Sequence, residues 1–314
     1  MIHRAVALLV VALVLGGLIV SVAQPGHGSD ILVGWKPSLA NPVLPAGPAG
    51  AWDEHIRERM WVLHEDGAYH AWYCGWQGPY VKNRPNLLHL GYATSPDGIR
   101  WTKHPGNPVF DKRWTEDICV VKDGETYYVY AEDESDGDTS IHLLTSTDKV
   151  NWLPRGNVLE AIPGSPWEDD WVGTPVVFKI GPEWHMLYEG GAPGYIGLAH
   201  SVNGSDWTRD ARSPVMTTAN SKQWERRAVV PQSLVRVNST WHLFYHANNG
   251  TWQTGVATSR DLIHWKRYGS NPIMKDKSAV VLELADRYSV YTQQGPTGEV
   301  INLHTLPKSV SAKQ

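Results

Sequence analysis

The residues of this chain that could do chemistry are acidic side chains in short segments, each lying close to a predicted β-hairpin. Cleavage of a glycosidic bond needs two carboxyl groups on opposite sides of the scissile bond, one protonated and the other ionised. The candidates for this catalytic role are Asp53, Asp117, Asp170 and Glu189. Further polar side chains in the same segments are candidates for binding the substrate: Arg59, Glu116, Glu168, Glu225, Arg226 and His246.

Repetition separates two kinds of acid among these candidates. The acids of the first kind directly follow a tryptophan and precede a tyrosine by 20 residues: Asp53, Glu168 and Glu225. A position repeated in this way favours a structural role. Asp117 has no acidic counterpart at its position in the other repeats, and this favours function. Asp170 and Glu189 are also unrepeated, and for them the structural and the catalytic roles both stay open.

The element that must position these acids is a hairpin that recurs along the chain. It reads "VLHEDGAYHAWY", "VVKDGETYYVY", "VFKIGPEWHMLY" and "LVRVNSTWHLFY", with a weaker copy at "VLELADRYSVY". Runs of β-branched and aromatic residues predict two strands, and Asp-Gly or Asn-Ser at the centre predicts a tight turn. A tyrosine marks the same position of each copy: Tyr73, Tyr130, Tyr188, Tyr245 and Tyr291.

Two shorter elements recur with the hairpin. The pattern S-x-[D/N]-x-x-x-W begins at Ser95, Ser146, Ser201 and Ser259, and an Asn-Pro-like element occurs five times, first at Asn41. Units of about 50 to 60 residues with four short strands each are typical of propeller blades. We therefore predict an all-β fold, a five-bladed β-propeller with four antiparallel strands per blade, over residues 41–305. Residues 24–40 are expected to be a linker and 306–314 a tail.

In a propeller the innermost strands start around one axial mouth, so acids of different blades can meet there. Each repeated unit also carries residues that stabilise its turns. The Asp or Asn of the S-x-[D/N]-x-x-x-W pattern can accept hydrogen bonds from backbone amides, and its Trp can pack between neighbouring blades. The S-x-[D/N]-x-x-x-W pattern is thus predicted to be structural, and the catalytic residues are predicted to lie at the axial mouth.

The remaining features bound the class of protein. Residues 1–23 read as a secretory signal peptide, with an uncleaved membrane anchor as the alternative, so the rest is expected outside the cytoplasm. A net charge of -4 and a pI near 6.4 argue against nucleic acid as a partner. The two cysteines, Cys74 and Cys119, are compatible with one disulfide or with two buried thiols. We expect a monomer.

From residue 31 to about residue 305 the chain resembles the five-bladed propeller glycosidases: glycoside hydrolase families 43 and 62, families 32 and 68, and the mannoside phosphorylases of family 130. The stretches "NPVL", "YATSPDGIRW" and "DGETYYVY" are typical of the whole group. The segment from Trp114 to Tyr128 is similar to W-A-P-[D/E]-V of family 43, whose acid tunes the pKa of the general acid. It is also similar to E-D-P-R of family 130, whose Asp donates the proton. Both comparisons fall on Asp117.

This resemblance implies an exported glycoside hydrolase with a carbohydrate substrate. In that reading Asp117 is the pKa tuner or proton donor, Asp53 the base that activates water, and Asp170 or Glu189 the remaining acid, while Arg59 and Arg226 hold substrate. Family 43 has its base where this chain has Glu58-Arg59-Met60, and E-G-P where it has Gly173-Thr174-Pro175. A glycan-binding propeller without turnover and a phosphorylase like those of family 130 therefore stay open.

No cofactor or catalytic metal is expected. The resemblance leaves room for a structural calcium ion, because some members of families 43 and 62 hold one in the axial channel.

Overall fold

The computed structural model describes residues 31–79, 88–191, 194–294 and 300–308. The chain divides into two units, Met1–Asp30 and Ile31–Gln314, and all the elements below belong to the second. The predicted signal peptide or anchor (1–23), the first part of the predicted linker and most of the tail lie outside the described residues. Within the described ranges no helix is long and apolar enough to cross a membrane.

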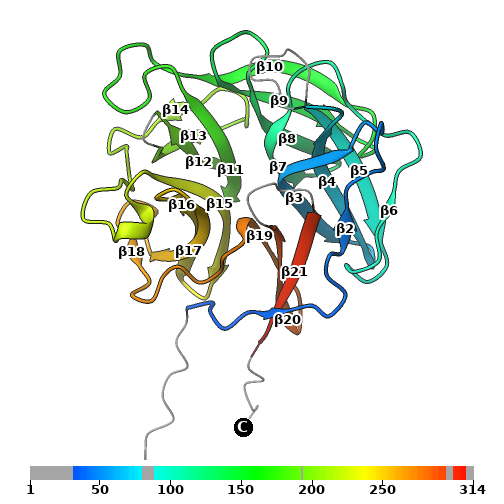
Figure 1. Ribbon diagram of the computed structural model, residues 1–314. Helices are drawn as coiled ribbons and strands as arrows, with labels where there is room; N and C mark the ends of the chain where they lie inside the picture. The colour runs from blue at the N-terminus through cyan, green and yellow to red at the C-terminus, as the bar shows by residue number, and fades with distance from the viewer. Residues whose placement is uncertain (1–30, 80–87, 192–193, 295–299, 309–314) are drawn as a thin grey trace, which may run out of the picture. The chain divides into compact units, whose positions relative to one another are not determined.

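Five antiparallel sheets form the second unit, and their innermost strands surround one axis (Figure 1). Blade one comprises β3 (His55–Glu65), β4 (Ala68–Trp76), β5 (His89–Ser95) and β6 (Thr102–Lys103). Blade two comprises β7 (Glu116–Asp123), β8 (Thr126–Asp133), β9 (Ser140–Ser146) and β10 (Leu153–Glu160). Blade three comprises β11 (Val172–Ile180), β12 (Glu183–Gly190), β13 (Tyr195–Ser201) and β14 (Thr208–Arg209).

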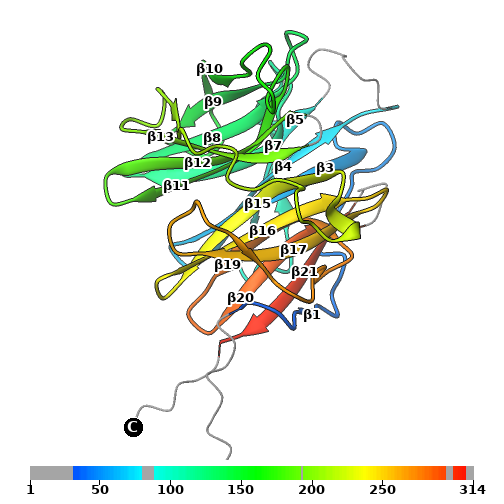
Figure 2. The same cartoon turned by 90° about the vertical axis from the view of Figure 1, so that its left-hand side faces the viewer.

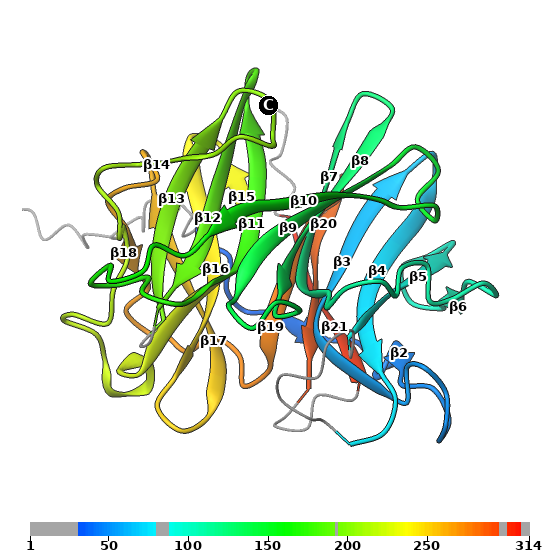
Figure 3. The ribbon, with the colours of Figure 1, turned by 90° about the horizontal axis from the view of Figure 1, so that it is seen from above.

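Blade four follows the short helix η1 (Gln223–Glu225) and comprises β15 (Ala228–Val237), β16 (Thr240–Asn248), β17 (Trp252–Ser259) and β18 (Lys266–Arg267). Blade five comprises β19 (Lys277–Glu283), β20 (Arg287–Gln293) and β21 (Val300–Pro307), joined by β1 (Lys36–Pro37) and β2 (Leu44–Pro45). The innermost strands β3, β7, β11, β15 and β19 contact their neighbours around the ring, including β19 with β3. The predicted all-β five-bladed propeller is confirmed, and Figure 3 shows it from above.

The ring is closed by the segment that precedes blade one. Lys36 pairs with Thr305 and Leu44 pairs with Ile301, so β1 and β2 both pair with β21. Figure 2 shows β1 near β21. Asn41 binds Leu303 through both its amide oxygen and its amide nitrogen, as Asn107 binds Tyr92 in blade one. Lys36 and Pro37, which were expected in the linker 24–40, instead pair with β21 and belong to the sheet of blade five.

The repeated turn has the predicted structural role. In the first copy Asp97 Oδ1 accepts hydrogen bonds from the amides of Ile99 and Arg100, at 2.9 and 2.8 Å. Trp101 of blade one packs edge-on against Tyr291 of blade five, with ring centroids 5.9 Å apart. The turn thus joins each blade to its neighbour.

Both cysteines are free, buried thiols, which was the predicted alternative to a disulfide. Burial is the main reason that the pKa of Cys119 rises to about 12, so this thiol stays protonated.

Candidate active site

Every innermost strand carries a break in its pairing with the second strand of the blade. The breaks fall between Arg57 and Trp61, Glu116 and Cys119, Gly173 and Val176, Pro231 and Ser233, and Lys277 and Val280. In four of the five blades a non-glycine residue inside or beside the break has a positive φ: Glu58 (57°), Asp117 (45°), Thr174 (47°) and Ser278 (56°). Such residues are uncommon and tend to occur at functional sites.

The side chains at these breaks meet across the blades, and Arg59 is their central connection. Its guanidinium is completely buried; Nε donates to Asp117 Oδ1 at 3.2 Å, and Nη2 donates to the Asp117 carbonyl. Nη1 donates to the carbonyls of Pro175 (2.9 Å) and Gln232 (3.2 Å). One residue of blade one therefore binds blades two, three and four. No part of this side chain reaches solvent, so we do not propose Arg59 as a substrate-binding residue.

Blade five joins the cluster through Glu58. Lys277 Nζ donates to Glu58 Oε1 at 2.7 Å, and Ser278 Oγ donates to Oε2 at 2.6 Å. Burial by itself would raise the pKa of Glu58, but the charges of Lys277 and Arg57 outweigh it and hold that pKa far below the ordinary value. Glu58 is thus an ionised carboxylate at the axis. It was missing from the residues selected from the sequence, although it stands where family 43 carries its base.

Asp117 lies in the cluster, as its singular position in the sequence predicted. Only 7% of its surface is exposed. Burial, followed by repulsion from Glu58, raises the pKa of Asp117 to about 7. The charge of Arg59 acts in the opposite direction. This carboxyl therefore exchanges its proton close to neutral pH.

Glu189 of blade three is the second acid of this kind. Thr174 Oγ1 donates to Glu189 Oε2 at 2.9 Å. Burial, followed by repulsion from Asp117 and Glu58, raises the pKa of Glu189 to about 8, although the Thr174 hydroxyl and Arg59 act in the opposite direction. Part of the residue remains exposed. Gly194 makes room for it, since a Cβ there would lie 2.3 Å from Glu189 Oε1.

Glu116 stands beside Asp117 but is bound by protein groups. Its Oε1 accepts from Arg57 Nε, and its Oε2 accepts from Trp114 Nε1 at 3.0 Å. With 2% of its surface exposed, it anchors Arg57 and is not placed to bind substrate as expected.

The three acids at repeated positions share one structural arrangement. Each accepts a hydrogen bond from the marker tyrosine of its blade and one from a cation on the outermost strand. The partners are Tyr73 and Lys103 for Asp53, Tyr188 and Arg209 for Glu168, and Tyr245 and Arg267 for Glu225. All three carboxylates are buried. They connect the segment ahead of each blade to the blade's outer edge, so we leave Asp53 out of the catalytic set and Glu168 and Glu225 out of the binding set.

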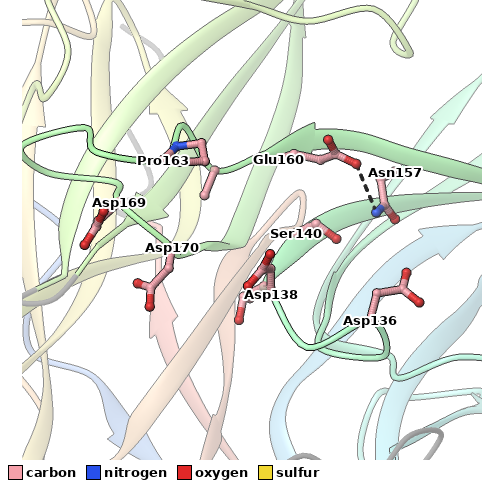
Figure 4. A pocket seen from close by; sticks show the side chains of 10 residues that line it. Asp136, Asp138, Ser140, Asn157, Glu160, Pro163, Asp169 and Asp170 are labelled. Atoms are coloured by element: carbon pink, nitrogen blue, oxygen red, sulfur yellow. Dashed lines mark hydrogen bonds between the residues drawn. The ribbon is translucent and has the colours of Figure 1, made fainter.

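Asp170 and Arg226 are exposed, and among the described residues neither side chain is hydrogen-bonded to the axial cluster. Asp170 lines a surface pocket of about 510 Å³ between blades two and three, together with Asp136, Asp138, Glu160 and Asp169 (Figure 4). Asp170 thus lines this pocket, and its catalytic role stays a prediction. Arg226 directly follows η1 and precedes the first strand of blade four.

His246 lies at the axis on blade four. Its ring packs on Trp252 with centroids 4.3 Å apart, and its Nε2 lies 3.3 Å from Gln232 Nε2. Burial is the main cause that lowers the pKa of His246 to about 3, so the imidazole is neutral at physiological pH. A neutral imidazole beside a half-exposed indole suits contact with an uncharged sugar. The substrate-binding role of His246 stays a prediction.

The cluster holds more acids than cations. Its carboxyl groups belong to Glu58, Glu116, Asp117, Glu132 and Glu189, and its cations to Arg57, Arg59 and Lys277. Burial and the repulsion between these carboxyl groups raise the pKa of Glu116, Asp117, Glu132 and Glu189, which favours protonated carboxyl groups in the cluster. In the part of the chain that the structure describes, no three His, Cys, Asp or Glu residues are placed to hold a metal ion. A structural calcium ion remains a prediction.

Replacing Arg59 by leucine is expected to lower the free energy of unfolding by about 3 to 5 kcal/mol, because it leaves Asp117 and two carbonyls buried without their donor. The melting temperature should fall by roughly 10 °C. Arg226→Leu is the matched control, since Arg226 is exposed and its loss should change the melting temperature by about 1 °C or less. Equal melting of the two variants would contradict the central role of Arg59.

A five-bladed propeller with proton-holding carboxyl groups at its axis is the architecture expected of the glycoside-active group named above. No protein-family model matches the sequence. The sequence is similar to that of a 1,2-β-oligomannan phosphorylase from Thermoanaerobacter sp. (strain X514). The two are 26% identical over 228 residues, which are 68% of this chain and 73% of the relative.

Solved structures show the same fold. One is β-1,2-mannobiose phosphorylase from Listeria innocua with β-1,2-mannobiose, at a TM-score of 0.65 and 14% identity, covering 87% of this chain and 96% of that one. Another represents family 130 of mannoside phosphorylases, which contains glycoside hydrolases that target β-1,2 mannosidic linkages in Candida mannan. Its TM-score is 0.67 at 14% identity, with 87% and 93% of the two chains covered. The resemblance to five-bladed propeller glycosidases is confirmed.

Proposed function

We propose that this protein is an exported glycoside hydrolase that cleaves a β-1,2-linked mannoside, with Glu189 as proton donor and Asp117 as base. The observation that carries the proposal is a pair of acids in the axial cluster: Glu189 of blade three, with a pKa of about 8, and Asp117 of blade two, with a pKa of about 7. An acid–base pair works best when its two pKa values lie near the operating pH and are pushed apart. The mannoside specificity rests on the names of the similar proteins.

In the proposed reaction Glu189 gives its proton to the leaving glycosidic oxygen while the bond from that oxygen to the anomeric carbon breaks. A water molecule attacks the anomeric carbon and loses a proton to Asp117. Positive charge develops on the sugar ring during this step, and the ionised Glu58, held by Lys277 and Ser278, stabilises it. Proton exchange with solvent then restores both acids.

The charges at the axis favour water over phosphate as the nucleophile. Phosphate is an anion and needs donors that are free to bind it. Here Arg59 is completely buried and binds Asp117, Arg57 binds Glu116, and Lys277 binds Glu58. These cations are thus bound by carboxylates of the cluster, and a phosphate ion would have to displace those carboxylates. The sequence match to a phosphorylase keeps phosphorolysis as the second candidate function.

Incubation of the purified protein with β-1,2-mannobiose is expected to release mannose at the same rate in phosphate-free buffer and in phosphate. Chromatography of the products, with mannose 1-phosphate as the standard, checks this result. Formation of mannose 1-phosphate only when phosphate is present would identify a phosphorylase. Binding of the disaccharide without any product, across a panel of other glycans as well, would identify a glycan-binding propeller without turnover.

A further inference from the structure

The side chain of Glu132, at the end of β8 in blade two, reaches the strand of blade three that carries Thr174. Thr174 N donates to Glu132 Oε2 at 3.1 Å, and Thr174 Oγ1 lies 3.4 Å from the same oxygen. The same hydroxyl donates to Glu189 Oε2 at 2.9 Å. One threonine therefore connects two carboxyl groups that come from different blades.

The sequence of β11 makes this contact possible. A Cβ on Gly173 would lie 2.1 Å from Glu132 Oε2, so only glycine lets the carboxyl approach the strand so closely. Thr174 itself has a φ of 47°, a strained conformation that its neighbours must hold in place. The hydrogen bond from its amide to Glu132 is part of that restraint.

Glu132 is placed to remain neutral. Only 3% of its surface is exposed, and burial together with repulsion from Glu116, Asp117 and Glu189 raises its pKa well above the ordinary value. Its hydrogen-bond partners among the described residues are the amide and the hydroxyl of Thr174. The carbonyl oxygen of a protonated carboxyl accepts an N–H in the same way as the amide oxygen of glutamine does.

We propose that Glu132 and Thr174 are positioning residues, in which a neutral Glu132 fixes Thr174 so that the hydroxyl of Thr174 orients Glu189 by donating to its Oε2. This rests on the proposed role of Glu189 as proton donor. Because Oε2 is occupied by the hydroxyl, Oε1 is the oxygen that carries the proton to the substrate. A Cβ on residue 194 would lie 2.3 Å from Oε1, so Gly194 leaves room for this oxygen.

The test compares three variants by direct titration of Glu189. Thr174→Val keeps the shape of the side chain and removes the donor, so the pKa of Glu189 should rise by about 0.5 to 1 unit, since the donated hydrogen bond favours the ionised form. Thr174→Ser keeps the donor and should leave that pKa unchanged. Glu132→Gln keeps the acceptor oxygen and, if Glu132 is neutral, should also leave it unchanged.

The readout is NMR of ¹³Cδ-labelled glutamate over a pH series, with the Glu189 signal identified by its absence in Glu189→Gln. This readout needs no turnover, so it stays informative even if the wild-type protein cleaves no glycan and the proposed function fails. In an active protein, Thr174→Val should in addition lower kcat about tenfold and shift the alkaline limb of the pH profile upward. An unshifted Glu189 signal in Thr174→Val, or a shift in Glu132→Gln as large as that in Thr174→Val, would overturn the proposal.

Discussion

Asp117→Asn is expected to lower kcat/KM on β-1,2-mannobiose by about 10² to 10⁴-fold, the range by which a positioned acid or base accelerates reactions. The fold should persist, because the amide oxygen of asparagine can still accept the hydrogen bond of Arg59. In the wild type, activity should rise as the pH passes about 7, where Asp117 ionises, and fall above about 8, where Glu189 loses its proton. The variant should lose the rise near pH 7.

The measurements are a pH profile of kcat/KM and a melting curve for each protein. Asp123→Asn is the matched control, because Asp123 lies at the other end of the same strand and pairs with Lys179 at the surface. That variant should keep the wild-type profile. Full activity of Asp117→Asn, with its melting temperature unchanged, would remove Asp117 from the mechanism.

Glu189→Gln should produce an equally large loss, but one that depends on the leaving group. With β-1,2-mannobiose the leaving alkoxide needs a proton, so kcat should fall by about 10² to 10⁴-fold. With a dinitrophenyl β-mannoside the leaving phenolate is stable without a proton, and the loss should be about tenfold or less. Glu183→Gln, at the exposed start of the same strand, serves as the control and should leave both rates unchanged.

The pattern across the two substrates also tests which acid has which role. A base is needed whatever the leaving group, so Asp117→Asn should be slow on both mannosides. If the activated substrate instead rescued Asp117→Asn and not Glu189→Gln, Asp117 would be the proton donor, as the similarity to family 130 implies. The assignment made here would then have to be reversed.

The fold could be predicted because its signals are local and repeated. Each hairpin carries its own turn residues, and Asp66 and Gly67 at the first turn have the positive φ values, 50° and 77°, that such turns require. The contribution of residues 36–45 to the last blade could not be predicted, because pairing between strands so distant in sequence leaves no local signal. The fifth copy of the Asn-Pro element, at Asn41, was the one available sign of it.

The site was predicted only in part, because candidates were chosen by two criteria: an acid at an unrepeated position, and an acidic residue type alone. Asp117 and Glu189 were found because no other blade has an acid at their positions, and the structure brings both to the axis. Asp53 was included on its residue type, although its repetition already favoured the structural bond with Tyr73 that is observed. Glu58 was missed because its environment depends on Lys277, 219 residues further along the chain.

The closure of the ring by β1 and β2 has a consequence for synthesis on the ribosome. The strands of blades one to four follow one another in sequence, so each of these sheets can form while the chain is still emerging. Blade five joins the earliest strands to the last one, and it must wait until Val300–Pro307 has been released. Lys277 also emerges late, so Glu58 gains its counter-ion only near the end of translation. The balance of positive and negative charges in the axial cluster is therefore among the last properties that the newly made protein acquires.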